Sequence, residues 1–229
     1  LTDRLGARRV FPALLLCAGA GAFFLAQAST LLQALAGGLV LGFAGTTFVV
    51  GEQSVSTWTP RERQGLALGC FGAGNVGTAL TTFGFPLLAV ALGWRSTLVV
   101  YAAVLLTAAV VYAHVVRDAP RTTCASLAAL LAPLAAPGAW LLGAYYVATF
   151  GVFVATTLLI TDLYVDAWGL SLAAAGMVAT TFTFTASLAR IPGGALADRF
   201  GARAVLGYSI PVVACALVPV SMGPSLAVA

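Results

Sequence analysis

Seven apolar stretches, each long enough to cross a bilayer as a helix, divide the chain and leave only short polar connections between them. A membrane-spanning helix needs about 20 mostly apolar residues, and 61% of the 229 residues are hydrophobic whereas only 8% are charged. That composition leaves too little polar surface to cover a soluble globule. We therefore predict an all-α membrane protein whose spans cover residues 10–28, 31–57, 66–91, 95–116, 138–160, 171–194 and 204–222.

The distribution of arginine predicts which side of the membrane each connection faces. Cytoplasmic connections carry an excess of Lys and Arg, and all eleven basic residues of this chain are arginines. Nine of them lie in four alternate connections, whereas the opposite connections hold only Arg95, with Asp162 and Asp166 in a predicted turn over 161–166. We predict that the protein lies in the inner (cytoplasmic) membrane. The connections predicted to face the cytoplasm are 1–9, 59–64, 117–137 and 195–203.

A charged turn occurs twice in the chain, 195 residues apart. The ten residues from Leu1 and the ten from Leu196 align without a gap and share Leu, Asp, Arg, Gly, Ala, Arg and Val. So long a period excludes a solenoid and indicates two similar half-proteins, as in some transporters. We expect a fragment that holds the remainder of one helical bundle (1–116), a central linker (117–137) and the beginning of a second bundle (138–229).

Arg190 is a charged residue within a predicted span. A guanidinium there is costly and cannot lose its charge, so something must compensate for it. Close to a helix end the side chain would extend to the lipid headgroups. If the helix continues to about Asp198, however, Arg190 lies about 12 Å further into the membrane than the charged turn that contains Asp198. Thr183 and Ser187 extend its polar face, which favours a water-filled cavity.

Glycines and an asparagine mark the third predicted span. Gly65, Gly69, Ala73 and Gly77 recur at every fourth position, a stripe that permits close contact between helices. The stretch also matches the dinucleotide-binding pattern G-x-G-x-x-G, but no strand precedes it and no acidic residue follows at the required distance. Asn75 projects away from the stripe, where it either forms an interhelical hydrogen bond or contacts a ligand.

Other polar residues give no sign of an enzyme. The four cysteines lie in apolar stretches without metal-binding spacing, and no nucleophile occurs with a base. We therefore expect no catalytic activity, no cofactor and no metal. Glu52 is the only acidic residue clearly within a span, where it either takes up a proton for symport or pairs with a neighbouring arginine.

The charged turn resembles the signature of the major facilitator superfamily. Its second copy, GALADRFGAR at 194–203, fits the pattern G-x-L-x-D-R-x-G-x-R. PRERQG at 60–65 and GWR at 93–95 are similar to the loops that follow the fourth and fifth helices of this superfamily. The resemblance covers essentially the whole chain and implies helices three to nine of a transporter with two bundles of six helices.

A narrower resemblance is to the nitrate/nitrite porter family. GTTF at 45–48 and GLALGCFGAGNVG at 65–77 are similar to its nitrate signature, while YVATFG at 146–151 and ARIPGG at 189–194 fit its seventh and eighth helices. Members bind nitrate between two arginines, and only the one from the eighth helix is present, at Arg190. The substrate-binding residues that the resemblance implies are Arg190, Asn75, Phe48, Tyr146 and Gly72.

The resemblance implies that nitrate or nitrite crosses the membrane by alternating access, through exchange or proton symport. Two arginines facing one monoanion leave excess positive charge, which favours obligate exchange. Alternatives are a transporter of another small organic anion or a drug, and a sensor that binds nitrate without transporting it. We expect a monomer in a lipid bilayer, with nitrate and nitrite, and protons in the symport case, as its partners and no nucleic acid.

The charged turns are expected to act as conformational latches. The Asp198 carboxylate can accept hydrogen bonds from a helix N-terminus, or pair with an arginine, in one state only. Arg199 and Arg203 belong to the same latch. Asp3 and Arg4 are expected to do the same in the other half.

Overall fold

The computed structural model describes residues 2–118, 129 and 132–221, and these residues form helices joined by short connections, without a strand. Six helical segments of the described chain are long and apolar enough to cross a membrane: Ala7–Ala26, Leu31–Trp58, Arg61–Leu92, Trp94–Val115, Pro137–Trp168 and Leu172–Phe200. They confirm the all-α fold class and six of the seven predicted spans. The seventh coincides with α13 (Ala202–Ser221), an apolar helix over Ala202–Val218.

Contacts divide the chain into two compact units. Unit 1 comprises Leu1–Pro60 and Gly84–Ala125, and unit 2 comprises Arg61–Phe83 and Ser126–Ala229. The division falls within one helix, α6 (Val76–Leu92). The two bundles predicted from the sequence belong to a complete transporter and stay a prediction. The central linker predicted at 117–137 lies mostly outside the described residues.

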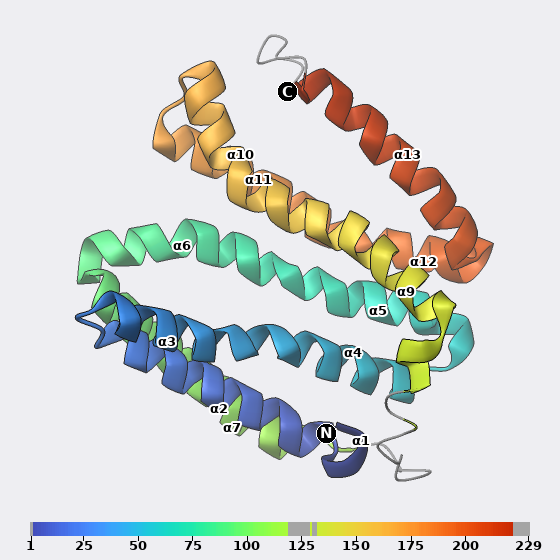
Figure 1. Ribbon diagram of the computed structural model, residues 1–229, viewed down its shortest axis with the longest axis horizontal. Coiled ribbons are helices and arrows are strands. Elements are labelled where there is room, and N and C mark those ends of the chain that lie inside the picture. The colour runs from blue at the N-terminus through green and yellow to red at the C-terminus, as the bar shows by residue number, and fades with distance from the viewer. Residues whose placement is uncertain (1, 119–128, 130–131, 222–229) are drawn as a thin grey trace. The chain divides into compact units, whose positions relative to one another are not determined.

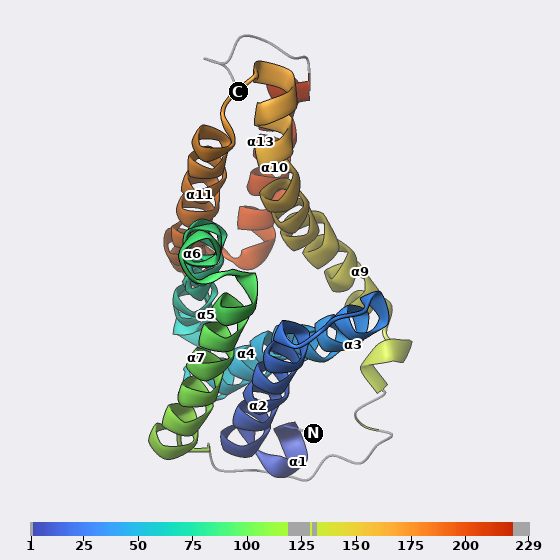
Figure 2. The same cartoon turned by 90° about the vertical axis from the view of Figure 1, so that its left-hand side faces the viewer.

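Unit 1 is built around α2 and α7, which lie side by side (Figures 1 and 2). Small residues make this contact close, because Gly19 lies against the Ala102 carbonyl and the Leu106 side chain, and Ala22 and Ala109 are buried. The helices of the unit are α1 (Thr2–Leu5), α2 (Ala7–Ala26), α3 (Leu31–Leu41), the 3₁₀ turn η1 (Gly42–Gly45), α4 (Thr46–Trp58), the second half of α6, and α7 (Trp94–Val115).

An arginine ties each end of the α2–α7 pair. At one end the Arg8 Nε–H donates to the Ala113 carbonyl at 2.9 Å, and the Arg8 backbone N–H donates to the Asp118 carboxylate at 2.8 Å. At the other end Arg95 donates from Nη2 to the Ala28 carbonyl at 3.1 Å. Cations near helix C-termini and carboxylates near helix N-termini are favourable, so these contacts stabilise the antiparallel pair.

Unit 2 contains the residues predicted around Arg190. Figure 2 shows α9 continuing through a π-helical turn into α10 as one rod, and α11 returns antiparallel to α10. The elements of the unit are η2 (Arg61–Arg63), α5 (Gln64–Gly72), the 3₁₀ turn η3 (Ala73–Asn75), the first half of α6, η4 (Ala132–Ala135), α9 (Pro137–Tyr146), the π turn η5 (Val147–Gly151), α10 (Val152–Trp168), α11 (Leu172–Leu188), α12 (Arg190–Phe200) and α13.

The turn predicted over 161–166 is wrong, because α10 continues to Trp168 and both aspartates are helical. The helix ends at Gly169, which has φ +64° and left-handed backbone geometry. Its N–H donates to the Val165 carbonyl at 3.0 Å, and the Leu170 N–H donates to the Tyr164 carbonyl at 3.2 Å. The bond from Gly169 to the carbonyl four residues earlier is that of the αL C-cap motif, and glycine adopts its left-handed geometry at the lowest steric cost.

Four spans contain a non-α turn near their middle. Three of these turns are η1, η3 and η5, and the fourth is a turn at Ala189 between α11 and α12. Pro192 explains the fourth, because proline has no N–H to donate to the carbonyl of Leu188 and its ring crowds that carbonyl. Such interruptions often mark functional positions, and three of the four lie in unit 2 beside the candidate site.

Candidate functional site

Arg190 lies at the break between α11 and α12, inside the span Leu172–Phe200. The helix continues past Asp198 to Phe200, as predicted. Ten further residues of helix place Arg190 about 15 Å from that end along the axis. The side chain is half-buried, and the residue lies well inside the span, away from its Phe200 end.

Glycines let α5 approach α12 until their backbones touch. A Cβ added to Gly65 would meet the Gly194 carbonyl, and one added to Gly194 would meet the Gly65 carbonyl. A Cβ on Gly69 would meet the Arg190 carbonyl. Gly77 has nothing within 4 Å of such a Cβ, so the predicted stripe does not extend that far. The 3₁₀ turn η3 intervenes, and its three residues per turn change the helical phase.

The close approach places Asn75 and Gly72 beside the Arg190 side chain. With the Asn75 amide oriented by hydrogen bonding, its Oδ1 accepts from Arg190 Nη1 at 3.0 Å and from Nη2 at 3.2 Å. A Cβ on Gly72 would lie 3.0 Å from Arg190 Cδ and 3.3 Å from Nη1. Asn75 therefore holds the end of the guanidinium fork, and the missing side chain at Gly72 leaves room for it.

Aromatic rings of the α9–α10 rod cover the guanidinium. Its central carbon lies over the Phe153 ring at 5.2 Å from the centroid and over the Phe150 ring at 5.5 Å. Tyr146 stacks on Phe150 with the ring centroids 5.1 Å apart. Tyr146 was predicted to bind the substrate, whereas Phe150 and Phe153 were not among the predicted residues. Spacings of four and three residues place Tyr146, Phe150 and Phe153 on one helix face, and this was the only indication in the sequence. An aromatic stripe of this kind usually indicates core packing.

The described contacts of the Arg190 guanidinium are an amide oxygen and two aromatic rings, and none of them is a carboxylate. Its positive charge is therefore oriented but not neutralised by these groups. A guanidinium carries five N–H donors, and Asn75 uses one from each Nη nitrogen. The Nε–H and one further N–H on each Nη face other directions. The arrangement can attract a small anion and offer it parallel donors.

Two other residues predicted to extend this polar face do not do so. Thr183 and Ser187 are both 0% exposed. Their hydroxyls donate to the carbonyls of Ala179 and Thr183, at 2.9 and 2.6 Å. The prediction is wrong for them because short hydroxyl side chains can satisfy themselves on the preceding turn and then pack as small residues.

Asp198 of α12 contacts the N-terminus of α5. One carboxylate oxygen accepts the Gly65 N–H at 2.6 Å, and the other accepts the Leu66 N–H at 2.7 Å. A carboxylate there satisfies two free donors and the positive end of the helix dipole. This is one of the two contacts anticipated from the sequence, and the latch role built on it stays a prediction. Arg199 lies over the Phe200 ring at 5.2 Å, and Arg203 is exposed.

The remaining predicted residues lie in unit 1. Phe48 and Glu52 share one face of α4 and are half-buried, and their roles stay predictions. Asp3 and Arg4 lie in α1, but their side chains are outside the described residues.

The sequence profile described as Major Facilitator Superfamily matches residues 1–161 of this chain. The chain belongs to the major facilitator superfamily. This membership and the six apolar spans make it a multi-pass membrane protein of a transporter family. Among the described residues, no three His, Cys, Asp or Glu side chains gather in a group that could hold a metal ion.

Relatives within the superfamily bear names that refer to nitrate or nitrite. The chain is 34% identical over 227 residues to the "Probable nitrate/nitrite antiporter NarK1" of Thermus thermophilus, covering 93% of this chain and 51% of the relative. It is 32% identical over 229 residues to the "Nitrite extrusion protein" of Bacillus subtilis, covering 99% and 58%. It is 34% identical over 230 residues to the "Probable nitrate/nitrite transporter NarK2" of Mycobacterium tuberculosis, covering 96% and 58%. The chain thus spans 51–58% of the length of these curated relatives.

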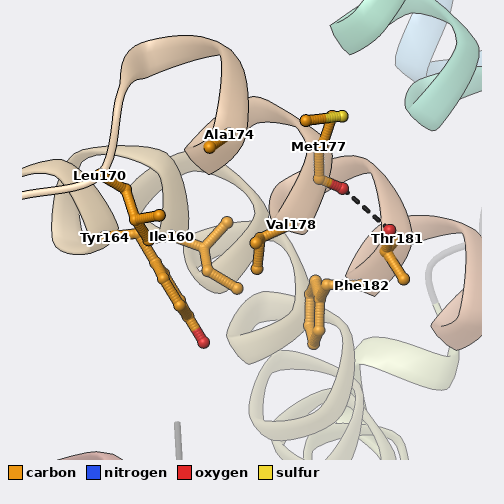
Figure 3. Close-up of a pocket in the computed structure, with 8 residues that line it drawn as sticks. All are labelled: Ile160, Tyr164, Leu170, Ala174, Met177, Val178, Thr181 and Phe182. Atoms are coloured by element: carbon orange, nitrogen blue, oxygen red, sulfur yellow. Dashed lines mark hydrogen bonds between the residues drawn. The ribbon is translucent and has the colours of Figure 1, made fainter. Parts of the chain in front are cut away.

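A second feature of unit 2, apart from the Arg190 site, is a cavity between α10 and α11 (Figure 3). Its volume is about 510 Å³. Its lining is mostly apolar, and the Thr181 hydroxyl donates to the Met177 carbonyl at 2.9 Å. The lining residues include no charged side chain, so the cavity does not suit a small anion. They are Ile160, Tyr164, Leu170, Ala174, Met177, Val178, Thr181 and Phe182.

Proposed function

We propose that the complete protein is a secondary transporter that carries nitrate and nitrite across the cytoplasmic membrane by alternating access. The observation that carries this proposal is the Arg190 guanidinium, held inside a span by Asn75 and two rings without a carboxylate among its described contacts. An intramembrane arginine normally faces a partner or a water-filled cavity. The names of the relatives support nitrate and nitrite as the anions.

The chemistry of the guanidinium suits a flat monoanion. Nitrate has three acceptor oxygens in one plane, and two of them can accept parallel hydrogen bonds from one guanidinium. Because Asn75 occupies the end of the fork, the anion would approach the Nε side. The Phe150 and Phe153 rings lie beside the guanidinium, and water that they exclude would strengthen the attraction between the charges. A lysine would supply charge without the planar pair of donors.

Exchange follows from charge if the complete protein brings a second arginine to the anion. Two guanidinium groups around one monoanion leave a net positive site when the anion departs. The empty site is then costly to carry through the membrane, so the protein reorients with nitrate or nitrite bound. In this proposal connections 1–9, 59–64, 117–137 and 195–203 face the cytoplasm, since they hold most of the arginines.

The proposal is tested by replacing Arg190 in the complete protein reconstituted into liposomes. Arg190→Lys keeps the charge but loses the fork, so we expect nitrate uptake to fall at least about a hundredfold, the scale of losing a charge-assisted bidentate contact. Arg61→Lys is the matched control, because Arg61 is exposed in η2, and it should transport as the wild type does. Nitrate uptake at the wild-type rate by well-folded Arg190→Lys protein would refute the proposal.

A further inference from the structure

We propose that Phe153 is a positioning residue, which fixes the plane of the Arg190 guanidinium and so makes the site prefer planar trigonal anions over pyramidal ones. The inference rests on the proposed function and deepens it. It concerns which anions the site accepts, and it assigns that selectivity to a ring outside the set predicted from the sequence.

Two contacts in different directions restrain the guanidinium. The Asn75 oxygen accepts from both Nη nitrogens and so holds the group by its edge. The Phe153 ring, at 5.2 Å, is the nearer of the two rings that the guanidinium overlies. An edge contact alone leaves the plane free to rotate about the line to Asn75. The Phe153 ring lies beneath the central carbon, at a distance typical of cation–π contacts, and so hinders that rotation.

Phe153 is itself held by aromatic neighbours on both sides. Its centroid lies 6.0 Å from that of Phe150 and 6.1 Å from that of Phe182, with interplanar angles of 29° and 27°. Phe182 belongs to α11, so the row of rings joins the α10 and α11 arms of the hairpin. Phe182 also lines the apolar cavity between these helices (Figure 3). Phe153 is therefore supported from a second helix, whereas Phe150 lies in the π turn η5.

The shape of the anion decides what a fixed plane achieves. A planar trigonal anion can place two oxygens on parallel N–H groups while its third oxygen stays in the guanidinium plane. A pyramidal anion of the same charge, such as chlorate, must place its third oxygen out of that plane. On the side covered by rings, that oxygen meets the electron-rich ring face, which repels negative charge. A fixed guanidinium therefore favours nitrate, and a mobile one discriminates less.

The test compares nitrate and chlorate uptake by the complete protein in liposomes, with nitrate binding measured on the same samples. For Phe153→Leu we expect the nitrate KM to rise about tenfold, as for loss of a partly desolvated cation–π contact. The chlorate KM should stay unchanged or rise at most about twofold, so the preference for nitrate falls about fivefold to tenfold. Phe153→Tyr keeps the ring and should restore both values.

Two further variants separate positioning from general packing. Phe182→Leu should lower the preference for nitrate in the same direction but less, and should add nothing to Phe153→Leu, because Phe182 acts through Phe153. Phe184→Leu is the matched control, since Phe184 is a 46% exposed phenylalanine of the same helix, and its preference should equal that of the wild type.

An unchanged ratio of nitrate to chlorate KM in folded Phe153→Leu protein overturns the inference, as does an equal loss for both anions. If Phe153→Leu cannot be recovered in folded form, Phe182→Leu decides, and an unchanged ratio there also overturns it. The proposed function fails separately: in that case the wild type itself neither binds nor transports nitrate.

Discussion

Gly72 sets how much room the Arg190 side chain has. A methyl group at this position would lie 3.0 Å from Arg190 Cδ and 3.3 Å from Nη1, closer than side chains normally approach. The long arginine side chain can move aside, but its nitrogens would then leave the Asn75 oxygen. Gly74, two residues later, has nothing within 4 Å of an added Cβ.

The pair Gly72→Ala and Gly74→Ala therefore tests the geometry of the site without changing its charge. We expect Gly72→Ala to raise the nitrate Kd about fivefold, equivalent to roughly 1 kcal/mol for one weakened hydrogen bond. Gly74→Ala should bind nitrate as the wild type does. Equal affinities for the two variants, measured by titration of the purified complete protein, would argue against the described position of Arg190.

At this scale the sequence predicts which residues matter better than it predicts how they touch. Arg190 and Asn75 are unusual because a charge and an amide are costly inside a span, and both join the site. Phe150 and Phe153 carry no such cost, so their contacts with Arg190 depend on tertiary packing that spacing alone does not specify. The hydroxyl of Ser187 misleads for the opposite reason, because it bonds to its own helix.

At the scale of elements, α5 and α12 are joined by backbone contact and by one carboxylate. Glycines remove the side chains that would separate the helices, and Asp198 accepts the two N–H groups at the start of α5. The glycine contacts set how closely the helices pack in this structure, whereas the carboxylate contact consists of two hydrogen bonds that can break and re-form. Asp198 is therefore the better candidate for a part that changes during transport.

Asp198→Asn should change the transport rate and leave the anion affinity unchanged. The amide loses the charge at the helix N-terminus and one of two acceptor oxygens, a cost of about 1 kcal/mol. We expect the maximal rate of nitrate exchange to change about threefold to fivefold, with KM within twofold of the wild type. Asp162→Asn, an exposed acid on α10, serves as the control. A shifted KM at an unchanged maximal rate would contradict the latch role.

Span positions are readable from the sequence because about 20 apolar residues have few alternatives in a bilayer. Helix ends are harder to predict. The aspartates at 162 and 166 suggested a turn, yet the helix ends at Gly169, where a left-handed residue closes the last carbonyls. The π turn η5 leaves no comparable signature. The 3₁₀ turn η3 contains Gly74 and Asn75, which are poor helix formers, but glycine is also frequent in transmembrane helices, so its presence does not predict a turn.

At the scale of the whole molecule, the chain spans 51–58% of its curated relatives, and the candidate site is built within unit 2 alone. In the proposed function, unit 2 supplies one half of the anion site. In that function, Arg190 attracts nitrate because its described contacts orient the guanidinium without neutralising it.

Nitrate binding to Asn75→Asp tests that claim most directly. The new carboxylate would stand about 3 Å from both Nη nitrogens, where Asn75 Oδ1 stands now, and would neutralise Arg190 without removing it. We predict that the nitrate Kd of the complete protein rises at least about a hundredfold, as expected for an ion pair at this distance in a partly buried site. Asn75→Leu, which adds no charge, should bind with a loss of less than about tenfold, the size of one lost charged hydrogen bond. Asn75→Asp protein that is folded and binds nitrate as tightly as Asn75→Leu would contradict the account.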